Sequence, residues 1–167
     1  MTVNFSVSLK KAVHVFSAGH FITLKNDLCE AIHGHNWTVA CLTSGTPDNH
    51  GMVIDFIFLR DTLSEIIARL DHSLLLPTKN PFLNVTKQTH AGREEVLVTF
   101  EKRRWIFPAD ECRLLPLINT TAELLAEWIG TELLERLAQN GSRQLGFIRL
   151  EVDECLGQSA IWEKVMD

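Results

Sequence analysis

The strongest constraint on the fold is a long alternation of apolar and polar residues near the start of the chain. Over residues 3–16, the apolar members are Val3, Phe5, Val7, Leu9, Val13 and Val15, with Lys11 as the exception. The polar members between them are Asn4, Ser6, Ser8, Lys10 and His14. Alternate side chains of a β-strand lie on the same face, so this pattern predicts one long strand with one buried face.

Three further segments are expected to be strands. Residues 35–43 predict the second strand, and residues typical of turns follow it at 46–49. At the end of the chain, 146–155 and 159–164 predict two shorter strands, which a turn at Gly157 joins.

Two segments space their apolar residues as amphipathic helices do. In 56–70 these residues are Phe56, Leu59, Leu63, Ile66, Ile67 and Leu70, and Asp55 is placed to cap the helix. In 121–139 they are Ala122, Leu125, Ile129, Leu133 and Leu137, and Asn140-Gly141 is expected to end the helix. The order of strands and helices predicts an α+β fold, an antiparallel β-sheet with two helices packed on one face.

A polar stretch of roughly 74–118 separates the two helices. A connection of this length rarely lacks structure of its own, and segments 95–100 and 104–107, around Lys102-Arg103, predict an inserted β-hairpin. A length of 167 residues suits one domain. We therefore expect a single domain over 1–167 that carries this insert.

Composition excludes several classes of protein. The net charge is −5 and the chain has no basic run, which argues against a nucleic-acid partner. No apolar stretch approaches the roughly 20 residues of a membrane span, and the N-terminus has no signal-peptide core. The four cysteines form no Cys-x-x-Cys pair, which argues against a disulfide framework and a sulfur-rich zinc site. These features predict a soluble cytoplasmic protein with reduced thiols.

A group of histidines is the first chemical signal. In His33-Gly34-His35, two imidazoles two residues apart point to one face of an extended chain and could share one ion. His20, just past the first strand, could meet them across a two-strand ladder. Three histidines with an open position are typical of catalytic zinc. The alternative is that these are unrelated histidines of two strands.

Candidate proton-transfer groups lie in two short motifs. Cys29-Glu30 precedes His33 closely, and a thiol near a bound dication can have a lowered pKa and act as a base or nucleophile. The alternative is a buried structural cysteine. Asp71-His72 directly follows the first helix and could form a proton relay. The alternative is a histidine that the helix dipole favours at a helix C-terminus.

Glu154 continues the apolar face of the strand over 146–155, whose other members are Ile148, Leu150 and Val152. A carboxylate in such a place must be paired or lie at a pocket, and a planar ligand with adjacent N–H donors would satisfy it. The alternative is a strand-end residue already in solvent. Thr120 and Glu123, at the start of the second helix, fit a capping box, which would explain them structurally.

Taken together, the motifs resemble the 6-pyruvoyltetrahydropterin synthase / 6-carboxytetrahydropterin synthase family. The matching segments, in family order, are Phe16-Ser17-Ala18-Gly19-His20, Cys29-Glu30-Ala31-Ile32-His33-Gly34-His35-Asn36-Trp37, Val53-Ile54-Asp55-Phe56, Leu70-Asp71-His72, Asn119-Thr120-Thr121-Ala122-Glu123 and Val152-Asp153-Glu154. They span about residues 5–163, and only the 74–118 insert has no recognised counterpart. Six motifs in one order are far more specific than any one of them.

The resemblance implies a tunnelling fold, in which the sheets of several protomers join into a barrel. It implies a homohexamer built as a dimer of trimers, with active sites at the subunit interfaces and a small-molecule pterin as substrate. It also implies Zn2+ as cofactor, on His20, His33 and His35. Cys29 would be the catalytic base, assisted by Asp71 and His72 of the neighbouring protomer. Glu154 would anchor the pterin, with Thr121 and Glu123 nearby.

Glu30 departs from the usual pattern. A cysteine at the position of Cys29 resembles the synthase type, which the resemblance links to 6-carboxy- or 6-pyruvoyl-tetrahydropterin made from dihydroneopterin triphosphate. The 6-carboxy product belongs to queuosine-type synthesis. A glutamate at the position of Glu30 resembles a variant that cleaves the side chain to 6-hydroxymethyl-dihydropterin, a folate precursor. Having both resembles a bifunctional subgroup, although Glu30 could also be a solvated loop residue. A silent pterin- or purine-binding module is the alternative from another class, which Cys29, Asp71 and His72 argue against.

Overall fold

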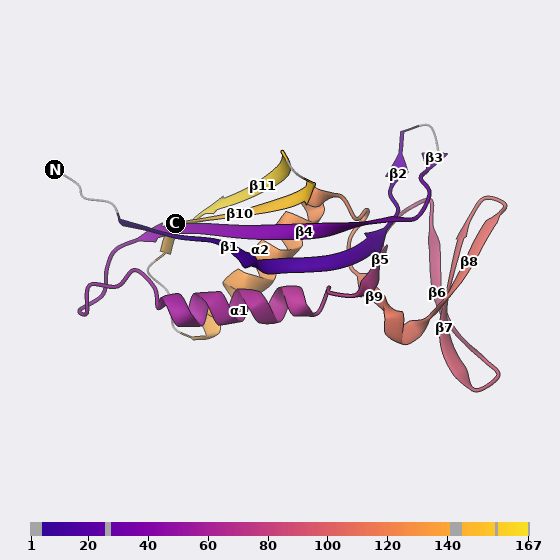
Figure 1. The fold of residues 1–167 in the computed structure, drawn as a ribbon, viewed down its shortest axis with the longest axis horizontal. Helices are drawn as coiled ribbons and strands as arrows, with labels where there is room; N and C mark the ends of the chain where they lie inside the picture. The colour runs from indigo at the N-terminus through magenta and orange to yellow at the C-terminus, as the bar shows by residue number, and fades with distance from the viewer. Residues whose placement is uncertain (1–4, 26–27, 141–144, 156, 167) are drawn as a thin grey trace.

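The structure is a computed structural model that describes residues 5–25, 28–140, 145–155 and 157–166 of the 167-residue chain. The expectations for Val3, Asn4 and Gly141, and for the side chain of Lys11, lie outside this part. A six-stranded sheet forms the centre of the molecule (Figure 1), in the order β11-β10-β4-β1-β5-β9. Its members are β1 (Phe5–His20), β4 (His33–Gly45), β5 (Ser73–Pro77), β9 (Cys112–Leu115), β10 (Leu145–Cys155) and β11 (Gln158–Val165).

Most of this sheet is antiparallel, as expected. Strand β1 pairs antiparallel with β4, β4 with β10, and β10 with β11. The last two strands lie within the insert, and they extend the sheet in parallel: β5 pairs with β1, and β9 with β5. The turn between β10 and β11 contains Gly157 at φ +84°, a conformation that favours glycine.

The predicted alternation within β1 is correct at Val7 and Leu9 but wrong at Phe5, which is 49% exposed, and wrong again further along. Val7 and Leu9 are buried, but the exposed fraction of Val13 is 69% and His14 is fully buried. The register between β1 and β4 shifts between Lys10 and Val15. Lys10 pairs with Ala40 and Val15 with Thr38, so β1 gains an odd number of residues over β4, and the residues that follow this irregularity change faces. His14 therefore lies on the face predicted for the apolar residues.

Both helices cover one face of the sheet, as predicted (Figure 1). Helix α1 (Phe56–Ala68) begins at Asp55, whose carboxylate accepts hydrogen bonds from the backbone N–H groups of Ile57 and Phe58. Helix α2 (Ala122–Gln139) ends at Asn140. Its predicted apolar stripe is buried, and so is that of α1 except for Phe56, which is exposed.

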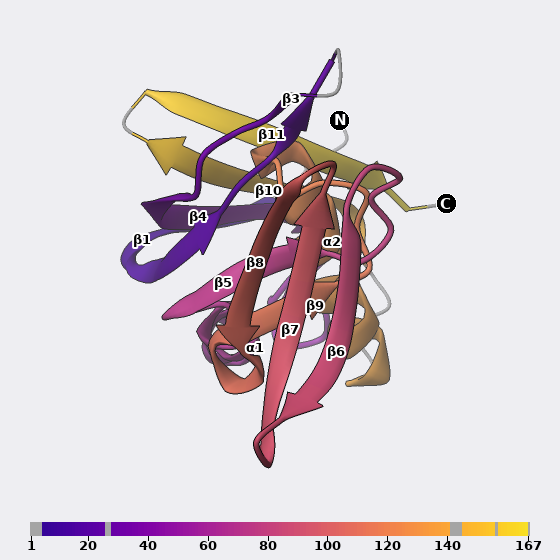
Figure 2. The same cartoon turned by 90° about the vertical axis from the view of Figure 1, so that its right-hand side faces the viewer.

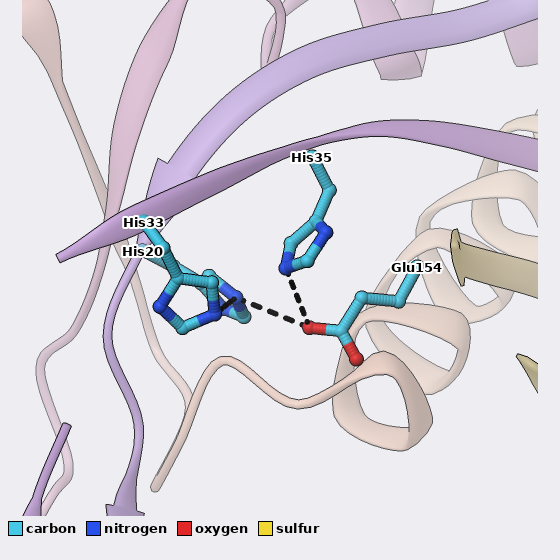
Figure 3. Close-up of side chains that lie close together, drawn as sticks. All are labelled: His20, His33, His35 and Glu154. Carbon is cyan, nitrogen blue, oxygen red and sulfur yellow. Dashed lines mark hydrogen bonds and ion pairs between the residues drawn. The ribbon is translucent and has the colours of Figure 1, made fainter. Parts of the chain in front are cut away.

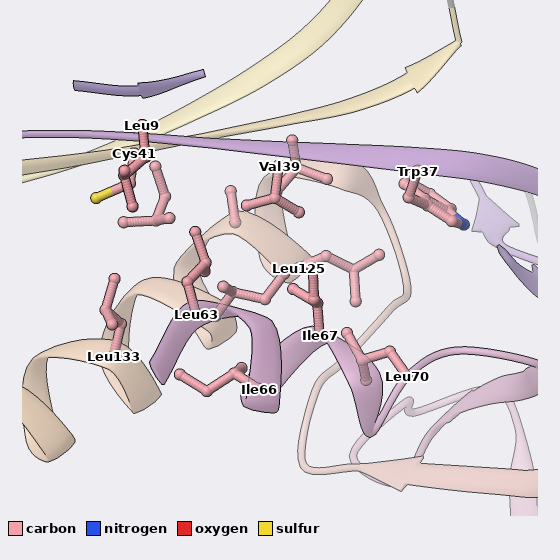
Figure 4. Packing of buried hydrophobic residues seen from close by; sticks show 14 of the residues in the cluster. Leu9, Trp37, Val39, Cys41, Leu63, Ile66, Ile67, Leu70, Leu125 and Leu133 are labelled. Atoms are coloured by element: carbon pink, nitrogen blue, oxygen red, sulfur yellow. The ribbon is translucent and has the colours of Figure 1, made fainter. Parts of the chain in front are cut away.

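The main core lies between the helices and the sheet (Figure 4). It joins Leu63, Ile66 and Leu70 from the first helix region to Leu125 and Leu133 of α2. The sheet contributes Leu9, Trp37, Val39, Cys41, Ile148, Leu150 and Val152. Trp37 is fully buried, and its indole N–H donates to the carbonyl of Ala18, which fixes the two long strands against each other.

The insert is larger than the predicted hairpin. Strands β6 (Asn84–His90), β7 (Arg93–Phe100) and β8 (Arg103–Pro108) form a separate antiparallel sheet, followed by the 3-10 helix Ala109–Glu111. Figure 2 shows this sheet across one end of the molecule. It closes a second apolar core, formed by Phe21, Cys29, Leu76, Leu83, Val96, Val98, Phe100 and Cys112. Two short strands, β2 (Thr23–Leu24) and β3 (Leu28–Cys29), pair beside it. Within the described residues, no helix is long and apolar enough to cross a membrane.

Candidate metal centre and active site

The predicted histidine group forms at the ends of the two longest strands. His20 is paired with His33 across the β1–β4 ladder, and Ala18 is paired with His35. Between these pairs Gly19 lies opposite Gly34, where an added Cβ on Gly34 would come within 3.4 Å of the Ala18 carbonyl oxygen. A Cβ at Gly34 would thus make an ordinary van der Waals contact, so the expected need for a glycine between the two histidines is not evident in this ladder.

Four side chains converge at this point (Figure 3): His20, His33, His35 and Glu154. Each offers one ligand atom, and these atoms lie within 4.8 Å of one another. His20 Nε2 is 3.1 Å from His33 Nε2 and 3.2 Å from Glu154 Oε1. His35 Nε2 is also 3.2 Å from Glu154 Oε1. Donor atoms of a tetrahedral zinc site lie about 3.3 Å apart, given bonds of roughly 2.0–2.1 Å.

Backbone carbonyls orient two of the imidazoles. The Nδ1 atoms of His20 and His33 lie 2.9 Å from the carbonyl oxygens of Thr120 and Ala31, respectively. A carbonyl only accepts hydrogen bonds, so each Nδ1 carries the proton and each Nε2 carries a lone pair. Burial lowers the pKa of His20, which favours the neutral form that a metal needs.

The residues present fit a cation. Two Nε2 lone pairs and a carboxylate oxygen meet at 3.1–3.2 Å with no proton between them in the neutral tautomers. The Nε2 atom of His35 is buried, and its 3.2 Å approach to Glu154 Oε1 lacks the geometry of a hydrogen bond. Buried acceptors that face one another are unfavourable unless a positive charge lies between them. Nitrogen and carboxylate ligands in this number suit Zn2+.

The Glu154 carboxylate lies where the histidine Nε2 atoms converge, and not in solvent. Its side chain is 30% exposed, and Oε1 is the atom that faces His20 and His35. The pairing of β10 with β11 shifts register between Asp153 and Cys155, which separates Glu154 from the regular alternation. The expected role was as an anchor for the pterin ring. The geometry adds a second candidate role, as a fourth ligand of the metal.

Cys29 and Glu30 lie on the edge of the second core. Cys29 is buried, and Glu30 is half-buried directly after β3. The Glu30 backbone N–H donates to the Ile22 carbonyl, with an N···O distance of 3.1 Å. Burial raises the pKa of the Cys29 thiol, and nearby Arg103 opposes that rise. The sequence led us to expect a lowered pKa for the Cys29 thiol near a bound dication. The protein without a metal raises this pKa instead.

Asp71 and His72 contact each other but contact the strand at Ser17 rather than the histidine group. One Asp71 oxygen accepts from the Ser17 backbone N–H at 2.7 Å, and the other is 2.8 Å from His72 Nδ1. The His72 backbone N–H donates to the Ser17 carbonyl at 2.7 Å. His72 has φ +50°, which is uncommon for a non-glycine residue. It borders a cavity of about 500 Å³ whose lining also includes Ser17, Gly19, Gly34 and, from the histidine group, His35.

Helix α2 begins beside the metal centre. Thr121 is its N-cap, and its hydroxyl accepts from the Leu124 backbone N–H at 3.5 Å. The predicted capping box between Thr120 and Glu123 is therefore wrong by one residue. Thr120 is fully buried, and its carbonyl oxygen binds His20 instead. Glu123 is exposed in the first turn of α2.

The sequence did not indicate the backbone carbonyls that orient the histidines, nor the role of Arg103. The carbonyls of Thr120 and Ala31 act through the backbone, and backbone contacts leave no mark on residue type. Arg103 is visible in the sequence only as one of several charged residues in the insert. Its guanidinium reaches the carbonyls of Cys29 and Glu30.

Comparison with known proteins agrees with this geometry. A family model described as 6-pyruvoyl tetrahydropterin synthase matches residues 9–164. A protein of Pyrococcus horikoshii, provisionally named a 6-carboxy-5,6,7,8-tetrahydropterin synthase, is 35% identical over 144 residues, which cover 83% of this chain and 79% of that protein. A protein of Methanocaldococcus jannaschii with the same provisional name is 29% identical over 154 residues, 91% of each chain.

A solved structure extends the likeness to nearly the whole fold. The 6-pyruvoyl tetrahydropterin synthase of Plasmodium falciparum has a TM-score of 0.89 and 26% identity, and the match covers 99% of this chain and 100% of that one. The fold and these matches define a pterin enzyme of the tetrahydropterin synthase type. The chain belongs to the 6-pyruvoyl tetrahydropterin synthase family. The resemblance that the sequence motifs predicted is confirmed.

Proposed function

We propose that this protein is a zinc-dependent lyase that converts dihydroneopterin triphosphate to 6-carboxy-tetrahydropterin, with 6-pyruvoyl-tetrahydropterin as the other product of the same type. The observation that carries the proposal is the convergence of His20, His33 and His35 on one point, with hydrogen bonds at Nδ1 that leave the Nε2 lone pairs of His20 and His33 to bind a cation. The 6-carboxy product is preferred because relatives that match most of the chain carry that name.

Each group has a proposed role. The three histidines would hold Zn2+, which when bound polarises the oxygens of the substrate side chain and acidifies the neighbouring C–H and O–H groups. Cys29 would remove a proton, and its thiol lies on a segment that the protein holds by backbone bonds. Glu154 would accept the 2-amino and N3–H edge of the pterin, with Thr121 and Glu123 beside it.

Asp71 and His72 are proposed to act as a proton relay at the site of a neighbouring subunit. Their ion pair is supported by the 2.8 Å distance between Asp71 Oδ2 and His72 Nδ1, and the His72 side chain is 85% exposed. Within the described residues, the hydrogen bonds that join this pair to the rest of the chain go to Ser17 and not to the histidine group. A homo-oligomer, expected to be a hexamer, would bring the pair to another protomer's metal.

A second candidate reaction is cleavage of the dihydroneopterin side chain to 6-hydroxymethyl-dihydropterin, with Glu30 as base. The observation that favours it is the raised pKa of the buried Cys29 thiol beside a more accessible carboxylate at Glu30. The test offers dihydroneopterin and its triphosphate side by side to the zinc-loaded protein and identifies the products by mass spectrometry. We expect the 6-carboxy product from the triphosphate. Absence of any product from either substrate would leave only a binding module.

A further inference from the structure

Arg103 connects the insert to the segment that carries both candidate bases. Its Nη1 atom donates to the Cys29 carbonyl oxygen at 2.7 Å, and its Nη2 atom donates to the Glu30 carbonyl oxygen at 3.3 Å. One guanidinium therefore binds two consecutive carbonyls, a geometry that its planar fork allows and that a lysine ammonium cannot reproduce. Each hydrogen bond fixes the orientation of one peptide plane. Fixing the peptide planes after Cys29 and after Glu30 limits the directions in which these two side chains can point.

Aromatic rings support the guanidinium from the other side. The Arg103 guanidinium carbon lies 4.5 Å from the centroid of the Trp105 ring, and Trp105 stacks on Phe21 with centroids 5.1 Å apart. Phe21 is fully buried and directly follows His20 in the chain. Phe21, next to the predicted metal ligand His20, thus contacts Trp105, which contacts Arg103. Arg103 in turn binds the backbone of the two candidate bases.

The same segment is tied from its amide side. The Glu30 backbone N–H donates to the Ile22 carbonyl at 3.1 Å, so residues 29–30 are held between Ile22 and Arg103. The tight turn before Arg103 includes Glu101 at φ +49°, an uncommon conformation for a residue with a side chain. Such outliers persist where the surrounding structure fixes them. The turn places Arg103 at the start of β8, next to the segment.

We infer that Arg103 is a positioning residue, which holds the Cys29–Glu30 segment so that the two candidate bases face the substrate in a defined arrangement. The insert is then part of the active site rather than an addition at its border. This inference rests on the proposed function for its effect on catalysis, but the holding of the segment can be measured without substrate. Arg103 is exposed and is not a member of the second core, although its guanidinium packs on Trp105, which borders that core.

The experiment compares Arg103→Ala and Arg103→Lys with Arg104→Ala. Arg104 is the adjacent exposed residue of β8, so its variant matches the loss of charge without the two carbonyl contacts. Amide hydrogen exchange is followed in the peptide that spans residues 28–33. The kcat and KM values for each pterin product, and the zinc content, are measured on the same samples.

For Arg103→Ala we expect faster exchange over residues 28–33 and a kcat lower by about 10- to 100-fold, because a small misplacement of a base is costly. KM should change less than kcat, and the ratio of the 6-carboxy to the 6-hydroxymethyl product should shift. Arg103→Lys should restore at most part of the loss, and Arg104→Ala should match the unaltered protein. Zinc content should stay constant throughout.

Unchanged exchange in Arg103→Ala would overturn the inference, whatever the activity. Faster exchange with unchanged kcat and product ratio would also overturn it, because Arg103 would then be only structural. If the unaltered protein turns over neither pterin, the proposed function is wrong. That outcome does not overturn the inference that Arg103 holds the Cys29–Glu30 segment. The exchange measurement then decides alone whether Arg103 holds the segment.

Discussion

The three histidines and the two candidate bases lie close together in the sequence, but different kinds of structure hold them. His20, His33 and His35 stand on the longest antiparallel ladder of the molecule, over the main core. Cys29 ends the two-residue strand β3 and Glu30 follows it, beside the second core, where the insert contacts them through core packing at Cys29 and through Arg103. The metal centre therefore depends on regular strand pairing, whereas the placement of the bases depends on a few separate contacts.

This difference bears on the two candidate reactions of the proposed function. A metal centre common to several reactions is best held by rigid elements, because its ligands must keep one geometry. Under the proposed function, the candidate bases that would select the product lie on a segment that Arg103 of the insert contacts. Changes in the insert could then alter the product without disturbing the metal.

Replacing a histidine should give the largest effect. In His33→Ala, two neutral imidazoles remain, and we expect zinc affinity to fall by more than about 100-fold, with loss of all turnover. Metal analysis after dialysis and a competitive zinc titration measure this. His90→Ala is the control, because His90 is an exposed histidine of β6. Full zinc occupancy in His33→Ala would remove the assignment of the metal to this group.

Single substitutions of the two bases should separate the reactions. Cys29→Ala should lower the synthase-type conversion by about 10²- to 10⁴-fold and spare part of the side-chain cleavage. Glu30→Ala should do the reverse. Product ratios at constant zinc content measure both. If Glu30→Ala changes no rate, Glu30 is a solvated residue and the bifunctional hypothesis is dropped; if Cys29→Ala is also harmless, the protein is better described as a binding module.

Glu154 lies with the histidines, and it could serve the metal or the substrate. We expect Glu154→Gln to raise KM for the pterin by about 10- to 100-fold, because the amide loses the charge-assisted pairing. Zinc should be retained on the three histidines. The check combines steady-state kinetics with metal analysis. Loss of zinc from this variant would make Glu154 a ligand, and an unchanged KM with intact zinc would show that it serves neither purpose.

The sequence predicted the histidine group because strand alternation and spacing determine it. His33 and His35 face the same side by period two, and His20 reaches them through ladder pairing. Glu154 was found because a carboxylate on an apolar face needs an explanation. Both helices followed from apolar spacing, since the buried stripes of α1 and α2 use the predicted positions apart from Phe56.

The rest could not be predicted because it depends on contacts between distant residues. The change of face near His14 comes from the register shift between β1 and β4, which the pattern of residue types does not mark. Thr120 was expected to cap α2, but its carbonyl is needed by His20, a hundred residues earlier in the chain. The three-stranded sheet of the insert and the contact of Arg103 with Cys29 likewise join segments whose separation no local pattern records.

The smallest predicted effect concerns Asp71, whose segment is held by contacts with Ser17. The backbone N–H of Ser17 lowers the pKa of the Asp71 carboxyl from its ordinary value. A carboxyl with a lowered pKa in the folded state stabilises the protein above the unfolded pKa of about 3.9, and this contribution is lost as the pH falls through the folded pKa. The Asp71 side chain is 38% exposed. The effect should therefore be about 1 kcal/mol or less at pH 7.

Asp71→Asn keeps an oxygen that can accept from the Ser17 N–H but removes the charge. Urea unfolding at pH 7, 5 and 3 should show a free energy of unfolding below that of the unaltered protein at pH 7, with the difference shrinking towards zero at the acid end. Asp110→Asn, at an exposed aspartate of the 3-10 helix, is the control. If the difference in the free energy of unfolding between the two proteins stays constant with pH, the charge of Asp71 does not stabilise the turn at Asp71 and His72. The strained backbone of His72 would then depend on its own N–H bond to the Ser17 carbonyl.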